Sequence, residues 1–485
     1  MMKKMIFAIM AIVLTSLGLS SCRDVGMSLL PPPPRLEGDG DVLMWLTKGD
    51  RSAQLEKQNA LLNFGTATNS LPTITINDQA SYQRMDGFGY TLTGGSADLI
   101  NALPASTRDA LLQELFSDDS LAIRVNYLRL SIGASDLSAE PFTYNEMPSG
   151  QTDPDLVNFS IQKEQESLIP VLKRILAINP DIKILGSPWT APRWMKTTFN
   201  YVGGKLRPEY YTVYAGYLVK YIQAMQSEGI TIDAITPQNE PLHGGNNPSM
   251  VMEAAEQADF IKNALGPAFE SAGLATKIII YDHNADRPDY PISILEDADA
   301  NRFVDGSAFH LYAGNMSALS QVHQAFPDKN VYFTEQWVGG PSNFAEDLRW
   351  HISTILMGAT RNWSKNVLEW NLAADANYGP ATDGGCTNCL GALTIQGAAV
   401  ERNVAYYVIG HASKFVPDGS LRIQSDIVSN LQNVAFRTPE GKIVLIVINM
   451  NGSEQSFNIA YGDEQVETTL EAGAVATYVW DGAES

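Results

Sequence analysis

The stretches IDAITPQNEP, residues 232–241, and VYFTEQW, residues 331–337, decide how this sequence folds. Each is a short apolar run that leads into a glutamate, Glu240 in the first and Glu335 in the second. Apolar runs of this length, bounded by turn residues, are typical of buried parallel strands. We therefore expect both carboxylates at the carboxyl ends of two strands in a (β/α)8 barrel, the end that carries the chemistry in such barrels.

Two carboxylates that face one cleft are the groups that glycoside cleavage needs. One protonates the leaving oxygen, and the other attacks the anomeric carbon or activates a water that does so. The competing interpretation is that Glu240 and Glu335 merely end two strands at the surface. One N-E-P triplet is weak evidence, but glutamates that end the fourth and seventh of eight predicted strands favour the catalytic interpretation.

The predicted barrel covers residues 86–413 and gives the chain an α/β fold class. Strands alternate with helices here, which predicts a parallel sheet, and eight repeats predict that the sheet closes as a TIM barrel. We expect strands at 88–92, 127–132, 182–189, 232–240, 277–282, 304–312, 331–337 and 366–371, and helices at 99–116, 162–178, 208–228, 249–272, 292–297, 316–325 and 344–359.

The chain changes texture after a helix expected near 402–411. Within residues 414–485, the stretch 431–480 is rich in Val, Ile and Thr, and the PEG triplet at 439–441 is a hairpin signal between two strand-like runs. We predict a β-sandwich side domain here, completed by N-terminal strands within residues 41–85.

The N-terminus has the pattern of an export signal. A basic start, KK at 3–4, precedes an apolar run at 6–19 and the sequence LSSC, which ends at Cys22 and looks like a bacterial lipobox. We expect residues 1–21 to be a lipoprotein signal peptide and Cys22 to be the lipidation site. The alternative is an ordinary secretory signal with a chance cysteine.

Residues 22–40 contain four consecutive prolines and predict a stiff, extended tether. With lipid on Cys22, the protein would be exported and anchored at the cell envelope, in the outer membrane and facing the periplasm or the surface. The tether would then separate the catalytic unit from the membrane.

Composition narrows the class of substrate. The formal net charge of −21 disfavours nucleic acid, whose phosphates require Lys and Arg, and also disfavours polyanionic glycans. Three cysteines are too few for a disulfide framework. Cys386 and Cys389 have no nearby histidine pair to complete a zinc site, so outside the cytoplasm we expect a disulfide in the loop after the eighth strand.

Aromatic and charged side chains gather near the predicted strand ends. Trp189 and Trp370 follow the third strand and end the eighth, where indole faces could stack on sugars, although each could be a core residue. Arg129 lies within the second strand and Asp136 just beyond it. Because an arginine in an apolar run is costly unless paired, these two could grip sugar hydroxyls or form a structural ion pair.

Three further polar residues lie beside the two glutamates. Asn239 can bind a sugar hydroxyl and orient the neighbouring carboxylate of Glu240. His310 and Tyr312 end the sixth strand and share one face, so they could orient Glu335 or belong to a polar network at the barrel mouth.

Eight motifs in order resemble those of glycoside hydrolase family 30, which includes glucosylceramidases and bacterial and fungal endo-β-1,6-glucanases. They run from Tyr82 towards the C-terminus: DGFGYTLTGGSADLI, YLRLSIGASDLS, GSPWTAPRWMKT, TPQNEP, FHLY, YFTEQW, EWNL and GHASKFVPDGS. The resemblance implies a barrel fused to a β-sandwich and a retaining mechanism, with Glu240 as acid/base and Glu335 as nucleophile. It also implies a sugar site lined by Arg129, Asp136, Trp189, Asn239, His310, Tyr312 and Trp370, together with His283 from the stretch YDHN.

The loop DGGCTNCLGALTI looks like the bacterial β-1,6-glucanase branch of the family. We therefore expect an endo-β-1,6-glucanase that acts on a β-glucan oligo- or polysaccharide as a monomer, with no metal or organic cofactor. The alternatives within the family are β-glucosylceramidase, β-xylosidase and β-1,6-galactanase activity. An alternative from another class is a non-catalytic surface glycan-binding lipoprotein.

Overall fold

The computed structural model describes residues 40–66 and 68–482. The predicted signal peptide, the lipidation site at Cys22 and almost all of the predicted tether lie outside the described residues. Within the described part of the chain, we find no helix that is both long enough and apolar enough to cross a membrane.

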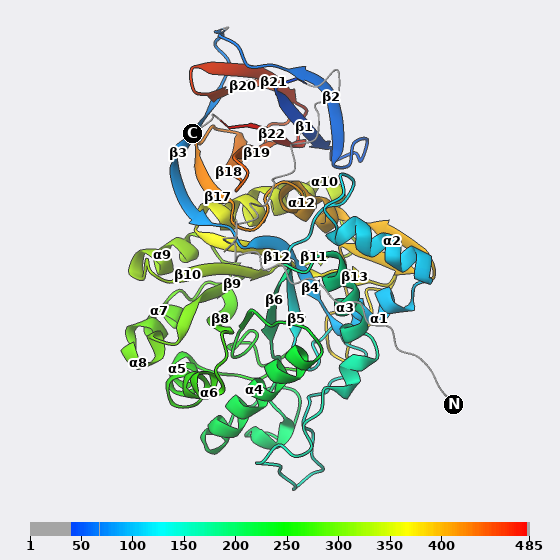
Figure 1. Ribbon diagram of the computed structural model, residues 1–485, viewed down its shortest axis with the longest axis vertical. Coiled ribbons are helices and arrows are strands. Elements are labelled where there is room, and N and C mark those ends of the chain that lie inside the picture. The colour runs from blue at the N-terminus through cyan, green and yellow to red at the C-terminus, as the bar shows by residue number, and fades with distance from the viewer. Residues whose placement is uncertain (1–39, 67, 483–485) are drawn as a thin grey trace, which may run out of the picture. The chain divides into compact units, whose positions relative to one another are not determined.

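Eight parallel strands close into the predicted barrel, and helices surround it (Figure 1). Around the barrel the order is β10-β12-β4-β5-β6-β7-β8-β9, so the first and last strands in sequence meet where β12 pairs with β4. The strands are β4 (Gly87–Leu92), β5 (Tyr127–Ser131), β6 (Lys183–Ser187), β7 (Ala234–Ile235), β8 (Lys277–Ala285), β9 (Val304–Gly314), β10 (Asn330–Glu335) and β12 (Ser364–Asn371).

One layer of side chains fills the barrel interior at a single level. Seven strands each contribute one buried apolar residue to it. The eighth strand contributes Gly89, because a Cβ there would lie 1.8 Å from the carbonyl oxygen of Tyr127. The apolar members of this inner layer are Tyr127, Leu185, Ala234, Ile279, Ala308, Tyr332 and Leu368.

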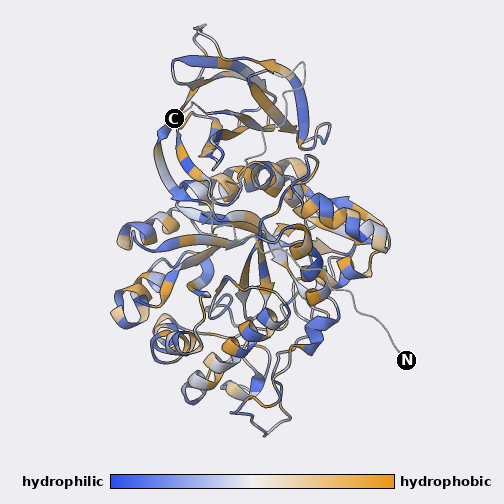
Figure 2. Ribbon diagram, viewed as in Figure 1, coloured by the Kyte–Doolittle hydropathy of each residue, from blue (hydrophilic) through white to orange (hydrophobic). Residues whose placement is uncertain are grey.

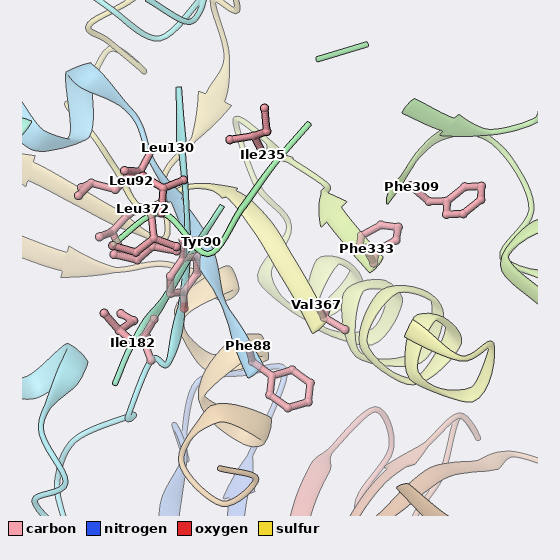
Figure 3. Close-up of a cluster of buried hydrophobic side chains, with 14 of the residues drawn as sticks. Phe88, Tyr90, Leu92, Leu130, Ile182, Ile235, Phe309, Phe333, Val367 and Leu372 are labelled. Atoms are coloured by element: carbon pink, nitrogen blue, oxygen red, sulfur yellow. The ribbon is translucent and has the colours of Figure 1, made fainter. Parts of the chain in front are cut away.

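A second apolar layer lies outside the barrel, between the strands and the helices (Figure 3). Strand residues alternate between the two layers, as the period of two requires. Around the outer helices, hydrophilic and hydrophobic residues intermix, as Figure 2 shows. Helices of this kind bury one stripe against the barrel and leave the rest to solvent.

The predicted helix at 99–116 was wrong, because the chain forms two helices here. Pro104 has no N–H to donate and disfavours helical backbone at the residue before it, so the first helix ends and a second begins. The helices are α1 (Gly94–Ala102), α2 (Ala105–Phe116), α3 (Leu168–Ile178), α4 (Tyr211–Ser227), α5 (Ala254–Phe260), α6 (Gly266–Ala272), α7 (Asp289–Glu296), α8 (Ala298–Asn301), α9 (Ser317–Ala325), α10 (Phe344–Trp350), α11 (Gly358–Arg361) and α12 (Val404–Ser413). Shorter or wider turns are η1 (Gln162–Gln165), η2 (Arg193–Met195), η3 (Pro208–Tyr210), η4 (Ile261–Leu265) and η5 (His351–Met357).

The β-rich side domain combines both ends of the described chain, as predicted. Its nine strands form one sheet in the order β2-β1-β22-β19-β18-β17-β3-β20-β21 around an apolar core of its own. The sheet folds over, since Gly65 beyond β2 pairs with Gln465 in β21. Its strands are β1 (Val42–Thr47), β2 (Glu56–Leu62), β3 (Thr73–Arg84), β17 (Leu421–Ser425), β18 (Leu431–Arg437), β19 (Lys442–Asn449), β20 (Gln455–Tyr461), β21 (Glu464–Leu470) and β22 (Val475–Asp481).

Small sheets brace the loops above the barrel. One of them joins the loop after β10 to the disulfide loop, where Gly339 pairs with Cys389. These short strands are β11 (Val338–Gly339), β13 (Ala373–Ala374), β14 (Cys389–Leu390), β15 (Leu393–Gln396) and β16 (Ala399–Arg402).

Candidate active site

A cleft of about 370 Å³ opens at the carboxyl end of the barrel, and both Glu240 and Glu335 line it. The other lining residues are Asp136, Trp189, Asn239, Leu242, His243, Asn246, His283, Asn284, Tyr312, Trp337, Trp370, Cys386 and Cys389.

The two glutamates reach the cleft in different ways. Glu335 ends β10, as predicted from the sequence. Glu240 does not end its strand, because β7 stops at Ile235, shortly before Pro237, which cannot donate to a strand ladder. Glu240 instead lies in the following loop with φ of 45°, a left-handed conformation that is uncommon and strained for a residue other than glycine. Its N–H donates to the carbonyl oxygen of Asp282 at 2.9 Å, which holds it there.

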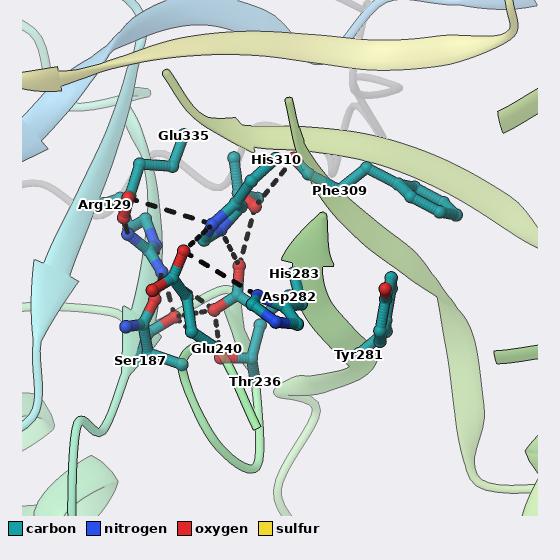
Figure 4. Close-up of polar contacts among 12 residues, drawn as sticks. Arg129, Ser187, Thr236, Glu240, Tyr281, Asp282, His283, Phe309, His310 and Glu335 are labelled. Carbon is teal, nitrogen blue, oxygen red and sulfur yellow. Dashed lines mark hydrogen bonds and ion pairs between the residues drawn. The ribbon is translucent and has the colours of Figure 1, made fainter. Parts of the chain in front are cut away.

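His310 brings the two carboxylates together (Figure 4). Its Nδ1 lies 3.2 Å from Oε1 of Glu240 and 3.8 Å from Oε1 of Glu335. The two carboxylate oxygens are therefore no more than about 7 Å apart, which excludes most of the range of roughly 6.5–9.5 Å that inverting glycosidases use. The geometry fits the shorter separation of retaining enzymes.

Arg129 binds Glu335 and Asp282, which excludes the alternative of a structural ion pair between Arg129 and Asp136. Its Nη1 donates to Oε2 of Glu335 at 2.5 Å, and its Nη2 donates to Asn239 at 2.6 Å. Tyr312 Oη donates to the other oxygen of Glu335 at 2.9 Å. Glu335 is thus held at both oxygens with a guanidinium beside it, which favours its ionised form.

Asp282 is the central residue that sequence reasoning missed. It is fully buried, and one of its oxygens accepts from Arg129, Ser187 and Thr236 at 2.8–2.9 Å. The other lies 2.7 Å from Thr334 Oγ1 and 3.1 Å from Nε2 of His310. The sequence did contain a signal for it, because an aspartate at the end of the apolar run KIIIYD is costly to bury without partners and therefore indicates a buried polar site.

A bulge in β8 turns Asp282 into the barrel. The residue two beyond the inner-layer Ile279 is Tyr281, which packs in the outer layer instead. Tyr281 and Asp282 both have positive φ, 74° and 62°, and the pairing with β9 shifts register there. One extra residue in a strand reverses the faces of the residues that follow, which is why simple alternation fails here.

The buried charges set the pKa values of the site. Burial alone would raise the pKa of Asp282, but the charge of Arg129 and the hydrogen bonds hold it well below its usual range. Burial would lower the pKa of His310, but the charge of Glu335 and its bonds to Asp282 and Glu240 raise it to about 9. His310 therefore carries a proton at neutral pH, between Asp282 and the two glutamates.

The glutamates themselves are shifted in opposite directions. Burial raises the pKa of Glu335, which the charges of His310 and Arg129 only partly offset. Burial would also raise the pKa of Glu240, but the neighbouring imidazoles of His283, at 3.7 Å, and His310, at 3.2 Å, hold it well below its usual range. In the free protein, the proton of the 3.2 Å contact between His310 and Glu240 thus lies on the imidazole.

Another part of the cleft wall combines tryptophans with a disulfide. Trp189 and Trp370 pack together with ring centroids 5.4 Å apart, and the disulfide between Cys386 and Cys389 lies in the same cluster. The N–H of Cys386 donates to Asp136 at 3.3 Å. Burial and the charge of Glu335 raise the pKa of Asp136 to about 7.

The structure divides the predicted sugar-binding residues into two groups. Asp136, Trp189, Asn239, His283, Tyr312 and Trp370 line the cleft. Arg129 and His310 are fully buried behind the two glutamates, where they can orient these carboxylates. Further residues that were not expected in the site from the sequence also line the cleft: Leu242, His243, Asn246, Asn284 and Trp337. Leu242, His243 and Asn246 lie in the loop after β7 and carry no strand-end signal in the sequence.

Glu240, His283 and His310 are also the group of described residues whose donor atoms come close enough to share a metal ion, within 4.8 Å of one another. His310 already lies between carboxylates on both sides.

Comparisons with known proteins agree with this geometry. Residues 85–416 match the glycosyl hydrolase family 30 TIM-barrel domain, and residues 419–478 match the family 30 β-sandwich domain. An endo-1,6-β-D-glucanase of Trichoderma harzianum is 34% identical over 81% of this chain and 83% of its own. The lysosomal acid glucosylceramidase of Mus musculus is 29% identical over 84% of this chain and 83% of its own.

Among solved structures, an endo-β1,6-glucanase superposes with a TM-score of 0.85 at 36% identity, over 92% of this chain and 100% of the other. The barrel match alone covers more than half of the chain. This chain therefore belongs to glycoside hydrolase family 30, and the resemblance drawn from its motifs is confirmed.

Proposed function

We propose that this family 30 glycoside hydrolase is a retaining endo-β-1,6-glucanase, with Glu335 as the nucleophile and Glu240 as the general acid and base. One observation carries the mechanism: both carboxylates contact the same nitrogen of His310, so they face one sugar-sized gap. The relatives named as endo-1,6-β-glucanases, at 34–36% identity, support the linkage.

In the first step, an oxygen of Glu335 attacks the anomeric carbon while the bond to the departing sugar breaks. Arg129 and Tyr312 hold the Glu335 carboxylate in place through one hydrogen bond each. This fixed orientation lowers the barrier, because the nucleophile needs no reorganisation. The product of the step is a glycosyl ester on Glu335 and a departing oxygen that needs a proton.

We propose that this proton comes from the contact between His310 and Glu240. His310 holds it on Nδ1 in the free protein, 3.2 Å from Glu240 Oε1. Glu240 passes it to the leaving oxygen as negative charge develops there. In the second step, Glu240 takes a proton from a water molecule and passes it back to His310 Nδ1, the water oxygen attacks the anomeric carbon, and the ester bond to Glu335 breaks.

The remaining lining residues form the pocket for the sugar whose bond is cleaved. Trp189 and Trp370 supply apolar faces, and Asp136 and Asn239 supply polar atoms for sugar hydroxyls. Asp136 is fixed by the N–H of Cys386, so the disulfide loop helps to position it.

The test is a panel of β-1,6-, β-1,3- and β-1,4-linked glucans, β-xylan and β-1,6-galactan, with products separated by length. We expect the fastest release from β-1,6-glucan, as oligosaccharides of several lengths. Release of single glucose units alone would contradict endo action, and no release from any glycan would favour a binding lipoprotein instead.

Glucosylceramidase activity is the second candidate, because the mouse relative carries that name at 29% identity. The cleft favours a glucan, since Asp136, His243, Asn246 and Asn284 offer polar atoms to sugar hydroxyls along its walls. An assay with a fluorescent glucosylceramide in detergent micelles distinguishes glucosylceramidase activity from β-1,6-glucanase activity. Turnover faster than that of β-1,6-glucan would reverse the assignment.

We further propose that the protein is an exported monomer tethered by lipid on Cys22. The support is the sequence LSSC after an apolar run, together with the following prolines. A Cys22→Ser variant should move the protein from the membrane fraction to the soluble fraction of a bacterial lysate. Unchanged membrane association would remove the support for a lipid anchor.

A further inference from the structure

The loop at 197–205, which follows β6 and η2 at the carboxyl end of the barrel, carries an exposed aromatic side chain. Phe199 is 40% exposed. The Arg193 guanidinium lies 5.0 Å from the centroid of its ring and 4.6 Å from that of Tyr201. Glu146 accepts from Nε of Arg193 at 2.7 Å, so the cation beneath these rings is already neutralised. The result is an aromatic surface without net charge.

A buried lysine fixes this loop. The Nζ of Lys196 donates to Thr190 Oγ1 at 2.8 Å, to the carbonyl oxygen of Tyr201 at 3.1 Å and to that of Ser249 at 2.8 Å. Only 3% of Lys196 is exposed, and burial lowers the pKa of its amine to about 7. A buried amine with three hydrogen bonds thus fixes the shape of this surface loop, as expected where a binding surface must be rigid before its ligand arrives.

The loop also joins the wall of the cleft on the side of Glu240. Gly203 donates to Ser249 Oγ at 2.9 Å, and a Cβ on Gly203 would lie 3.2 Å from the carbonyl oxygen of Gly244. Gly244 follows His243, which lines the cleft and whose N–H donates to the carbonyl oxygen of Glu240. Phe199 is four residues from Gly203, so at most about 14 Å of extended chain separates them.

We propose that Phe199, together with Tyr201, binds sugar units of the leaving-group portion of the glucan chain. The proposal rests on the proposed function, because Glu240 as the acid marks the side of the cleft from which the leaving group departs. Aromatic faces pack against the apolar faces of neutral sugars, and the neutralised Arg193 offers nothing to an anionic glycan. The cleft and this loop then form one continuous surface for a polymer.

The experiment compares Phe199→Ala with Trp350→Ala, a matched control on α10 whose side chain is also 40% exposed. Each variant is assayed on a long-chain glucan and on an aryl β-glucoside, which has no sugar on the leaving side. For Phe199→Ala we expect KM for the polymer to rise 5- to 20-fold, kcat to change less than twofold, and kinetics on the aryl glucoside to stay unchanged. Phe199→Trp should restore the KM, and Trp350→Ala should resemble the wild type on both substrates.

An unchanged polymer KM in Phe199→Ala would overturn the proposal. So would an equal change on both substrates, since that marks a structural defect. The comparison uses whichever glycan of the panel the wild-type protein cleaves fastest. A best substrate other than β-1,6-glucan would therefore contradict the proposed function and leave this test intact.

Discussion

Two neighbouring layers inside the same barrel differ sharply in chemistry. The inner layer, which runs from Tyr127 through Leu185 to Leu368, is apolar and closes the barrel at one level. Two residues further along the same strands, the inward positions hold the polar group of the active site: Thr91, Arg129, Ser187, Thr236, His310 and Thr334.

Successive inward residues of one strand therefore serve different roles, the first in stability and the next in catalysis. The strand period of two places both sets on the inside, so the apolar layer forms a rigid floor directly beneath the polar one. Charges on this floor are shielded from water, and their interactions are stronger for that reason. Substitutions in the polar layer should therefore mainly lower activity, and substitutions in the apolar layer should mainly lower the free energy of unfolding.

Among substitutions in the polar layer, we expect Glu335→Gln to have the largest effect on activity. Loss of the nucleophile should lower kcat by about 10⁴-fold or more, and Glu240→Gln should lower it by about 10²–10⁴-fold. Both variants should melt within a few degrees of the wild type, because the amide retains most hydrogen bonds. Hydrolysis at the wild-type rate by either variant would remove that residue from the mechanism.

Asp282→Asn should cost both activity and stability. Arg129 and His310 would lose a charged partner, so we expect kcat/KM to fall about 10²-fold and the free energy of unfolding to fall by about 3 kcal/mol. The control is Asp233→Asn at the opposite end of the barrel, where the carboxylate accepts from the N–H of Ile184 at 2.8 Å. If both variants lose activity equally, the special role of Asp282 is refuted.

Leu368→Ala probes the apolar layer, with the opposite expected balance. Leu368 is fully buried in the barrel interior, so the cavity should lower the free energy of unfolding by about 2–5 kcal/mol. Well below the melting temperature, kcat should change less than twofold. A large fall in kcat without destabilisation would mean that the two layers are not separable.

The smallest effect that we expect is a pH dependence. His310 has a pKa raised to about 9, and protonation there supplies the proton of the mechanism, so kcat/KM should decline as pH rises through about 9. The same shift contributes stability that is complete below about 6.5 and lost as pH rises through about 9. A basic limb near 6.5 would show that Asp282 and the glutamates do not hold the proton on His310.

The sequence predicted the barrel well because its signal is local. Apolar runs such as 331–337 and 366–371 ended within two residues of the observed strands. Glu335 was placed correctly since its strand is regular up to its last residue. The β-rich side domain was also predicted correctly, because the alternation of apolar and polar residues in β3 is visible in the sequence at 73–76.

The failures come from departures from regular geometry. Glu240 lies beyond a two-residue strand that Pro237 cuts short, and Asp282 faces inward only because of a bulge. Arg129 forms ion pairs with Glu335 and Asp282 and not with Asp136. Its partners depend on distances across the barrel, which the spacing of residues along the chain does not encode. These three exceptions are at the active site, where strain and buried charge serve function.

The most direct test of the account is to trap the covalent intermediate. A 2-deoxy-2-fluoro-β-glucoside with a good leaving group slows the second step, so the ester on the nucleophile should accumulate. We predict a mass increase of one fluoroglucosyl unit on the peptide that contains Glu335, and none in Glu335→Gln. A label on Glu240, or turnover without a label and with inversion at the anomeric carbon, would contradict the central claim.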